Sequence, residues 1–158
     1  MTHLLKQPRT LWILFVLFVL ETIGFGIIMW IWDFTIIDEM SHPESISAHI
    51  AAMSETQRLV HAWMTATLDV AYPLTYGPLF AGLALQRFRP AFAIPAIAVI
   101  PTDLAEGYVQ VMAMLGDESL LWLKAYVTPI KLALFIAAIG IAIAALLVWF
   151  RNRKNKPV

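Results

Sequence analysis

The sequence contains no cysteine and few charged residues. The absence of cysteine from all 158 residues excludes disulfide bonds, thiol redox chemistry and thiolate metal sites. Only 14% of the residues are charged, whereas soluble globular domains average about 25%, and 60% are hydrophobic. The formal net charge is +0, which argues against a nucleic acid as partner. This composition predicts a membrane protein.

Motifs of common active sites are also missing. The four histidines, at positions 3, 42, 49 and 61, all lie outside the middle of the apolar runs. A di-iron carboxylate bundle needs Glu-x-x-His pairs on facing helices, and the pair Asp103 and Glu106 lacks the histidine. No nucleophile–base pair, phosphate loop or nucleotide motif is present. We therefore expect no cofactor and no metal site.

Four apolar runs are long enough to cross a bilayer, which takes about 20 mostly apolar residues. They cover about residues 10–32, 62–85, 91–115 and 122–150. The first run is too long for a signal-peptide core and no small-residue cleavage site follows it, so we expect a retained signal anchor. Because the second, third and fourth runs are joined by short connections, neighbouring helices are expected to be antiparallel. We predict one membrane domain, all-α, folded as a polytopic four-helix bundle.

Charges and tryptophans predict how this bundle is oriented. Most of the cations fall into three groups that four spans place on one side: Lys6, Arg9, Arg87, Arg89, Arg151, Arg153, Lys154 and Lys156. By the positive-inside rule, both termini are then cytoplasmic. All six tryptophans lie near predicted span ends, where indole rings prefer to sit: Trp12, Trp30, Trp32, Trp63, Trp122 and Trp149.

The segment 33–61 is the only long connection, and it lies on the outer side in this topology. Ser41 and Glu44 match a capping box, and Pro43 suits the first turn of a helix. A modest apolar stripe follows along this segment, beginning at Ile46. We expect either an interfacial helix over the outer mouth of the bundle or a helical extension of the second span.

Acidic residues inside the apolar runs predict a polar site. Asp103 and Glu106 are three residues apart and share a helix face, and charge at membrane depth usually marks a functional site. Three runs each carry one such polar stripe at similar depth: Asp69, Tyr72 and Tyr76; Asp103, Glu106 and Gln110; Lys124, Thr128 and Lys131. We infer one shared site. The alternative is a structural network of buried salt bridges that fixes the helix register.

The four intramembrane acids outnumber the one intramembrane cation, Lys131. Because burial and neighbouring negative charge favour a neutral carboxylic acid, we expect one or two of the four to hold a proton at neutral pH. Glu106 or Asp69 is the expected ionised partner of Lys131. Asp103 or Glu21 is the expected neutral acid.

Prolines interrupt the backbone hydrogen bonds of the last three runs. Each one leaves the carbonyl four residues earlier without its helical donor, and a membrane offers no free water to replace it. Thr75, Thr102 and Thr128 are close enough in sequence to supply the missing donors.

Three motifs carry a resemblance to a known group. Asp69-x-x-Tyr-Pro-Leu-x-Tyr-Gly, Asp103-Leu-x-Glu and Thr128-x-x-Lys together resemble the pattern of uncharacterised small bacterial four-helix integral membrane proteins. The likeness covers about residues 60–150, and Gly107 stands where that group commonly has asparagine. The resemblance implies a multi-pass protein of the bacterial inner (cytoplasmic) membrane and implies no particular activity.

The site residues leave several functions open. We predict an intramembrane acidic and lysine site for a membrane lipid or lipophilic small molecule, with Asp103, Glu106 and Asp69 as candidate catalytic acids and bases of an enzyme acting on a lipid or isoprenoid. The alternatives are a proton-coupled carrier for a small solute and an accessory subunit of a membrane complex. As a carrier, the protein is expected to form a homo-oligomer. The expected ligand-binding residues are Glu21, Tyr72, Tyr76, Tyr108, Gln110, Thr128 and Lys131.

Overall fold

The computed structural model describes residues 2–38 and 40–154, and its secondary structure confirms the all-α class. No strand occurs among these described residues. In chain order the helices are α1 (Thr2–Leu5), α2 (Pro8–Trp32), α3 (Pro43–Ala52), α4 (Glu55–Arg87), α5 (Ile94–Met114) and α6 (Lys124–Lys154). Two 3-10 turns, η1 (Pro90–Ala93) and η2 (Leu121–Leu123), lead directly into α5 and α6.

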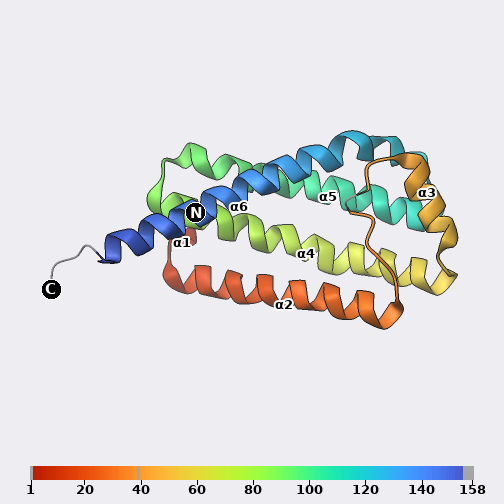
Figure 1. Ribbon diagram of the computed structural model, residues 1–158, viewed down its shortest axis with the longest axis horizontal. Helices are drawn as coiled ribbons and strands as arrows, with labels where there is room; N and C mark the ends of the chain where they lie inside the picture. The colour runs from red at the N-terminus through yellow and green to blue at the C-terminus, as the bar shows by residue number, and fades with distance from the viewer. Residues whose placement is uncertain (1, 39, 155–158) are drawn as a thin grey trace.

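The four long helices α2, α4, α5 and α6 run lengthwise beside one another in alternating directions (Figure 1). α4 contacts the other three, and α5 also contacts α6. α1 and the C-terminal end of α6 lie toward one end of the molecule, which we call the α1 end (Figure 1). α3 lies at the opposite end, which we call the α3 end.

Within the part of the chain that the structure describes, three helical stretches are long and apolar enough to cross a membrane: Pro8–Trp32, Pro90–Met114 and Leu121–Arg153. The length and apolar composition of these helices therefore indicate a membrane protein. α4 corresponds to the remaining predicted span and is the longest helix, at 33 residues, but it is not among the three stretches. Its position against three neighbours explains the lower hydropathy, because polar side chains on α4 face protein instead of lipid. The fourth span stays a prediction.

The connection between α2 and α4 differs in detail from the expectation. α3 begins at Pro43, but its N-cap is His42 and no side chain caps it, so the predicted capping box of Ser41 and Glu44 is wrong. A proline at the first helical position places the cap on the residue directly before it. A capping box forms instead where α4 begins, between Ser54 and Gln57. α4 thus extends the second predicted span by about two turns toward the α3 end.

Small residues bring the helices close together toward the α1 end. A Cβ atom on Gly77 of α4 would lie 2.6 Å from Ile100 Cγ1 and 2.9 Å from the Ala96 carbonyl oxygen, both on α5. Glycine is therefore needed for this approach of the two backbones. The surrounding core is apolar and includes Leu11, Leu79, Phe80, Ala81, Leu85, Ala93, Ala96, Val99, Ala138 and Ala142.

The prolines lie inside continuous helices, yet the threonines do not have the role expected for them. Thr75 and Thr128 donate hydrogen bonds to the carboxylates of Glu21 and Glu106. Thr102 donates to carbonyls three and four residues before it, not to the carbonyl that Pro101 leaves free. The expectation was wrong for Thr75 and Thr128 because each hydroxyl has one proton to donate, and a glutamate carboxyl oxygen accepts it.

Candidate functional site

Lys131 on α6 lies at the centre of a cluster of carboxylates. Its Nζ atom is 3.2 Å from Asp38 Oδ2 and 3.2 Å from Asp103 Oδ1, and it also forms an ion pair with Glu106. These acids come from two segments: Asp103 and Glu106 from α5, and Asp38 from the connection that follows α2. One ammonium group is therefore shared by three acids.

Glu106 is fully buried and has a second cation of its own. Lys124, at the first position of α6, is also fully buried and places Nζ 2.8 Å from Glu106 Oε1. Thr128, one turn further along α6, donates to the same oxygen. Lys124 also donates to the Ile37 carbonyl at 2.9 Å. Since buried polar and charged groups are tolerated only when paired and hydrogen-bonded, these contacts account for the burial of Glu106 inside the protein.

Asp38 ties the connection between α2 and α3 to the site. Its Oδ1 atom accepts a 2.9 Å hydrogen bond from Gln110 Nε2, and its Oδ2 atom faces Lys131. Burial opposes ionisation of Asp38, but the positive charge of Lys131 and the Gln110 hydrogen bond outweigh it and hold the pKa below its usual value. This connection is anchored through Asp38 and through the Ile37 carbonyl next to it.

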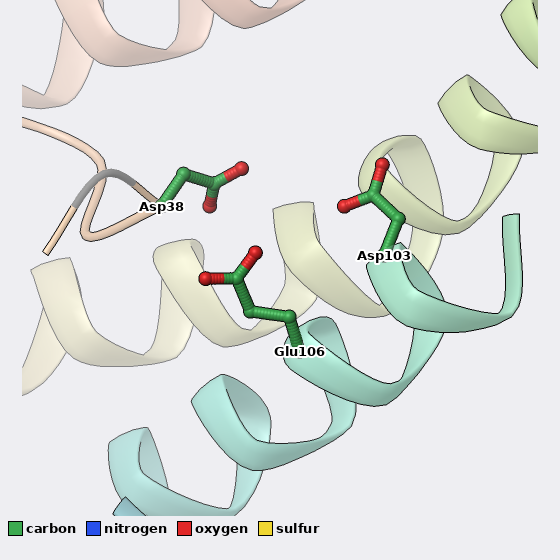
Figure 2. Close-up of side chains that lie close together, drawn as sticks. All are labelled: Asp38, Asp103 and Glu106. Carbon is green, nitrogen blue, oxygen red and sulfur yellow. The ribbon is translucent and has the colours of Figure 1, made fainter. Parts of the chain in front are cut away.

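The three acids around Lys131 have the spacing of a metal site. Figure 2 shows the carboxylates of Asp38, Asp103 and Glu106 facing a common space, and one oxygen from each lies within 4.8 Å of the others. These are oxygen ligands of the kind that Mg²⁺ and Ca²⁺ prefer. Lys131 contacts all three carboxylates, so its ammonium group supplies the positive charge in that space.

Aromatic side chains extend the site from α4. Tyr76 is buried and donates a 2.6 Å hydrogen bond to Asp103 Oδ2. The hydroxyl of Tyr72 lies 3.1 Å from Thr22 Oγ1 on α2. The rings of Tyr72 and Tyr76 are nearly perpendicular with centroids 5.2 Å apart, and Phe135 of α6 meets Tyr76 at the same distance. The two hydroxyls are thus engaged, and the rings form a wall.

Asp69 is the acid without a partner. Its side chain is only 8% exposed, yet no hydrogen bond or ion pair joins it to any residue in the described ranges 2–38 and 40–154. It lies on α4 beside Gly107 of α5, where a Cβ atom would be 3.5 Å from Asp69 Oδ2. Of the two expected partners of Lys131, Glu106 forms the ion pair and Asp69 does not. Asp38, which comes from outside the spans, takes that place.

A cavity of about 240 Å³ lies against this cluster. It is formed by α4, α5, α6 and the connection after α2. Its polar lining contains three of the acids, one lysine, two tyrosines and a threonine, and its apolar lining contains an isoleucine, a leucine and a phenylalanine. In chain order these residues are Ile36, Asp38, Asp69, Tyr72, Tyr76, Asp103, Thr128, Lys131, Leu132 and Phe135.

The structure brings together most of the residues predicted for one shared site, but not all. Glu21 accepts a 2.9 Å hydrogen bond from Thr75 and does not line the cavity, so it forms a separate pair. Tyr108 is 59% exposed and lies away from the site. Gln110 is fully buried behind the cavity, where it orients Asp38. Asp103, one of the two acids expected to be neutral, places Oδ1 3.2 Å from Lys131 Nζ.

Two residues of the site are missing from the expected catalytic and ligand-binding residues. Asp38 lies in the connection 33–61, and Lys124 lies on a predicted polar stripe but was not counted as an intramembrane cation. Lys124 had a visible signal, because it shares a helix face with Thr128 and Lys131. For Asp38 the signal was weaker: it follows Ile36 and Ile37, an apolar pair that packs inward and carries the acid with it.

Comparison with known proteins adds no relative, since no family model, curated protein or solved structure matches this chain.

Proposed function

We propose that the protein binds a lipophilic or amphipathic ligand within the membrane, in the cavity between α4, α5 and α6. The observation that carries this proposal is the lining of that cavity. Charged groups from Asp69, Asp103 and Lys131 converge on one region, while Ile36, Leu132 and other apolar side chains line the rest. Ligand sites are typically concave and mostly apolar, with a few polar groups that fix orientation. A ligand with a polar head and an apolar body matches this lining.

In the proposed arrangement, α2, α4, α5 and α6 form a four-helix bundle in a bacterial inner membrane, with both termini in the cytoplasm. Two features support it: the antiparallel packing of the four helices, and the tryptophans Trp12, Trp30 and Trp63, which are all more than 60% exposed. The described cations Arg87, Arg89 and Arg151 are at the end that would face the cytoplasm. Reporter fusions test this: a C-terminal fluorescent protein is expected to fluoresce, and a C-terminal alkaline phosphatase to be inactive.

The chemistry that we propose is proton transfer. Two acids, Asp103 and Glu106, are held next to lysine ammonium groups, whereas Asp69 has none in contact. Carboxylates in such different surroundings take opposite roles in general acid–base catalysis. Asp69 would exchange a proton with the bound ligand, while Lys131 holds Asp103 in place and Asp103 orients the hydroxyl of Tyr76. The resulting activity is an acid–base reaction on a lipid or isoprenoid.

A proton-coupled carrier for a small solute is the second candidate. It is favoured by the connection after α2, which reaches into the cavity with Asp38 and is held there by polar contacts that a conformational change can break. Activity in detergent without a proton gradient supports the enzyme. Transport that stops when the gradient is dissipated supports the carrier.

Mass spectrometry of the small molecules retained by the purified protein tests ligand binding itself. We expect a molecule that is present with the wild type and depleted at least tenfold in an Asp103→Asn/Glu106→Gln double variant. The matched control is Asp117→Asn/Glu118→Gln, which makes the same change of charge in the exposed turn after α5. The same retained molecules in both variants would contradict the proposed site.

A further inference from the structure

Hydrogen-bond donors and acceptors in the cavity are unequally engaged. Three side chains that line the cavity and carry donors, Lys131, Thr128 and Tyr76, already have acceptors inside the protein. Lys131 contacts three carboxylates, Thr128 donates to Glu106, and Tyr76 donates to Asp103. An anionic ligand would have to displace one of these contacts, because each of these three donors already has an acceptor among the described residues.

The acceptors are in excess. Three carboxylates line the cavity, from Asp38, Asp69 and Asp103, and one ammonium group lines it, from Lys131. Glu106 pairs with both Lys124 and Lys131, so the ammonium group of Lys131 is not left to the carboxylates of the cavity alone. Asp69 is the carboxylate left over, more than nine-tenths buried and without a partner among the described residues. A buried acid in this state needs either a proton or a cation.

Aromatic rings stand beside this free acceptor. Tyr72 and Tyr76 are on the same face of α4 as Asp69, three and seven residues further along the helix. With their hydroxyls turned to Thr22 and Asp103, both contribute ring surface to the cavity. The faces of aromatic rings attract ammonium groups within about 6 Å, and most strongly where water is excluded.

We propose that the ligand of this cavity is an organic cation, an amine with an apolar body. Its ammonium group would bind Asp69 against the rings of Tyr72 and Tyr76, and its apolar body would lie along Leu132 and Phe135. The proposal rests on the proposed function and adds the chemical class of the ligand. A cavity of about 150 Å³ holds benzene, so about 240 Å³ suits a molecule of roughly ten non-hydrogen atoms.

Three probes that each contain eight carbons test the charge: octylammonium, octanol and octanoate. Each is titrated by calorimetry into the purified full-length protein in a maltoside detergent. We expect octylammonium to bind at least tenfold more tightly than the other two. An Asp69→Asn variant is expected to lose at least tenfold in affinity for octylammonium, and Asp69→Glu to retain most of it. Asp117→Asn, in the exposed turn, is the matched control and is expected to bind like the wild type.

The outcomes separate this inference from the proposed function. Octanol or octanoate binding as tightly as octylammonium would overturn the cationic ligand and leave a ligand-binding cavity. Unchanged octylammonium affinity in Asp69→Asn would do the same. Binding of none of the three probes, with no retained molecule by mass spectrometry, would overturn both. The comparison of the three probes on the wild type decides the question even where a variant does not fold.

A free alkylamine and the amine of an ethanolamine lipid headgroup share this chemistry. Repeating the octylammonium titration in lipid discs separates the two sources. If the lipid is the natural ligand, discs of phosphatidylethanolamine are expected to weaken octylammonium binding at least tenfold relative to discs of phosphatidylcholine. Equal affinity in both discs supports a free amine.

Discussion

The two ends of the molecule differ in the side chains that lie between α4 and α5. Toward the α1 end, α4 and α5 meet through Gly77, with alanines and other apolar side chains around them. Toward the α3 end, the same two helices carry Asp69, Asp103 and Glu106, and a cavity opens between them and α6. Apolar side chains also pack at the α3 end, among them Ile46, Ile50 and Met64. The contrast is therefore between the contact of α4 and α5 at Gly77, which we call the apolar end, and the charged cluster with its cavity, which we call the polar end. Apolar packing in both clusters holds the helices together around the charged groups.

Breaking the buried ion pair at the polar end is expected to have the largest effect. A Lys124→Met variant leaves Glu106 with one lysine fewer in a fully buried site, and removing one partner of a buried pair costs about 3–5 kcal/mol. Denaturant or thermal unfolding in detergent measures it. Adding Glu106→Gln to Lys124→Met should restore part of the loss. A Lys124→Met variant as stable as the wild type would show that the pair contributes nothing.

Enlarging a glycine at the apolar end comes next. Gly77→Ala forces a new methyl group against Ile100 and the Ala96 carbonyl, and overpacking of this kind costs about 1–3 kcal/mol. Gly26→Ala on α2 is the control, because a Cβ atom there meets nothing within 4 Å. Thermal unfolding of both variants measures the difference. Equal midpoints would mean that α4 and α5 do not depend on their close approach.

A pH effect of about 1–2 kcal/mol is expected from His61, near the start of α4. Its ring is fully buried, stacks on Phe34 at 4.9 Å, and has no hydrogen-bond partner on either nitrogen among the described residues. Burial, opposed by Asp38 and reinforced by His49 and Lys124, lowers its pKa to about 4.

The direction of this pH effect on stability follows from whether the unfolded or the folded protein binds the proton at the higher pH. The unfolded imidazole is protonated below a pH of about 6.5 and the folded one only below about 4, so stability falls as the pH is lowered through this range. The unfolding midpoint of the wild type is expected to drop between pH 7 and pH 5 by more than that of His61→Phe. Parallel curves for the two proteins would exclude His61 as the cause.

The smallest effect is expected at Glu21, which belongs to neither end. Glu21→Gln keeps a side chain that can accept the hydrogen bond of Thr75, so stability should change by less than about 1 kcal/mol. Octylammonium affinity should stay within about twofold, because Glu21 does not line the cavity. A tenfold loss of binding would place Glu21 in the site after all and favour the carrier.

Helical periodicity predicted much of this arrangement, since residues three, four and seven apart share a face. That rule grouped Tyr72 and Tyr76 with Asp69, and Thr128 with Lys131, all of which line the cavity. It could not say which partner each group chooses, because partners come from helices whose relative rotation is set by packing. Asp38 shows the limit most clearly. A connection has no helical period, and the apolar pair before Asp38 indicates burial but does not indicate Lys131 as the partner.

The absence of cysteine permits one direct test of the contrast between the ends. Single cysteines are introduced at Thr128, which lines the cavity, and at Ala81, which is fully buried at the apolar end. The protein is then exposed to a small water-soluble methanethiosulfonate reagent in liposomes. The account predicts that the cysteine at position 128 reacts at least tenfold faster than the one at position 81. Equal rates, or no reaction at position 128, would contradict a polar cavity within the membrane.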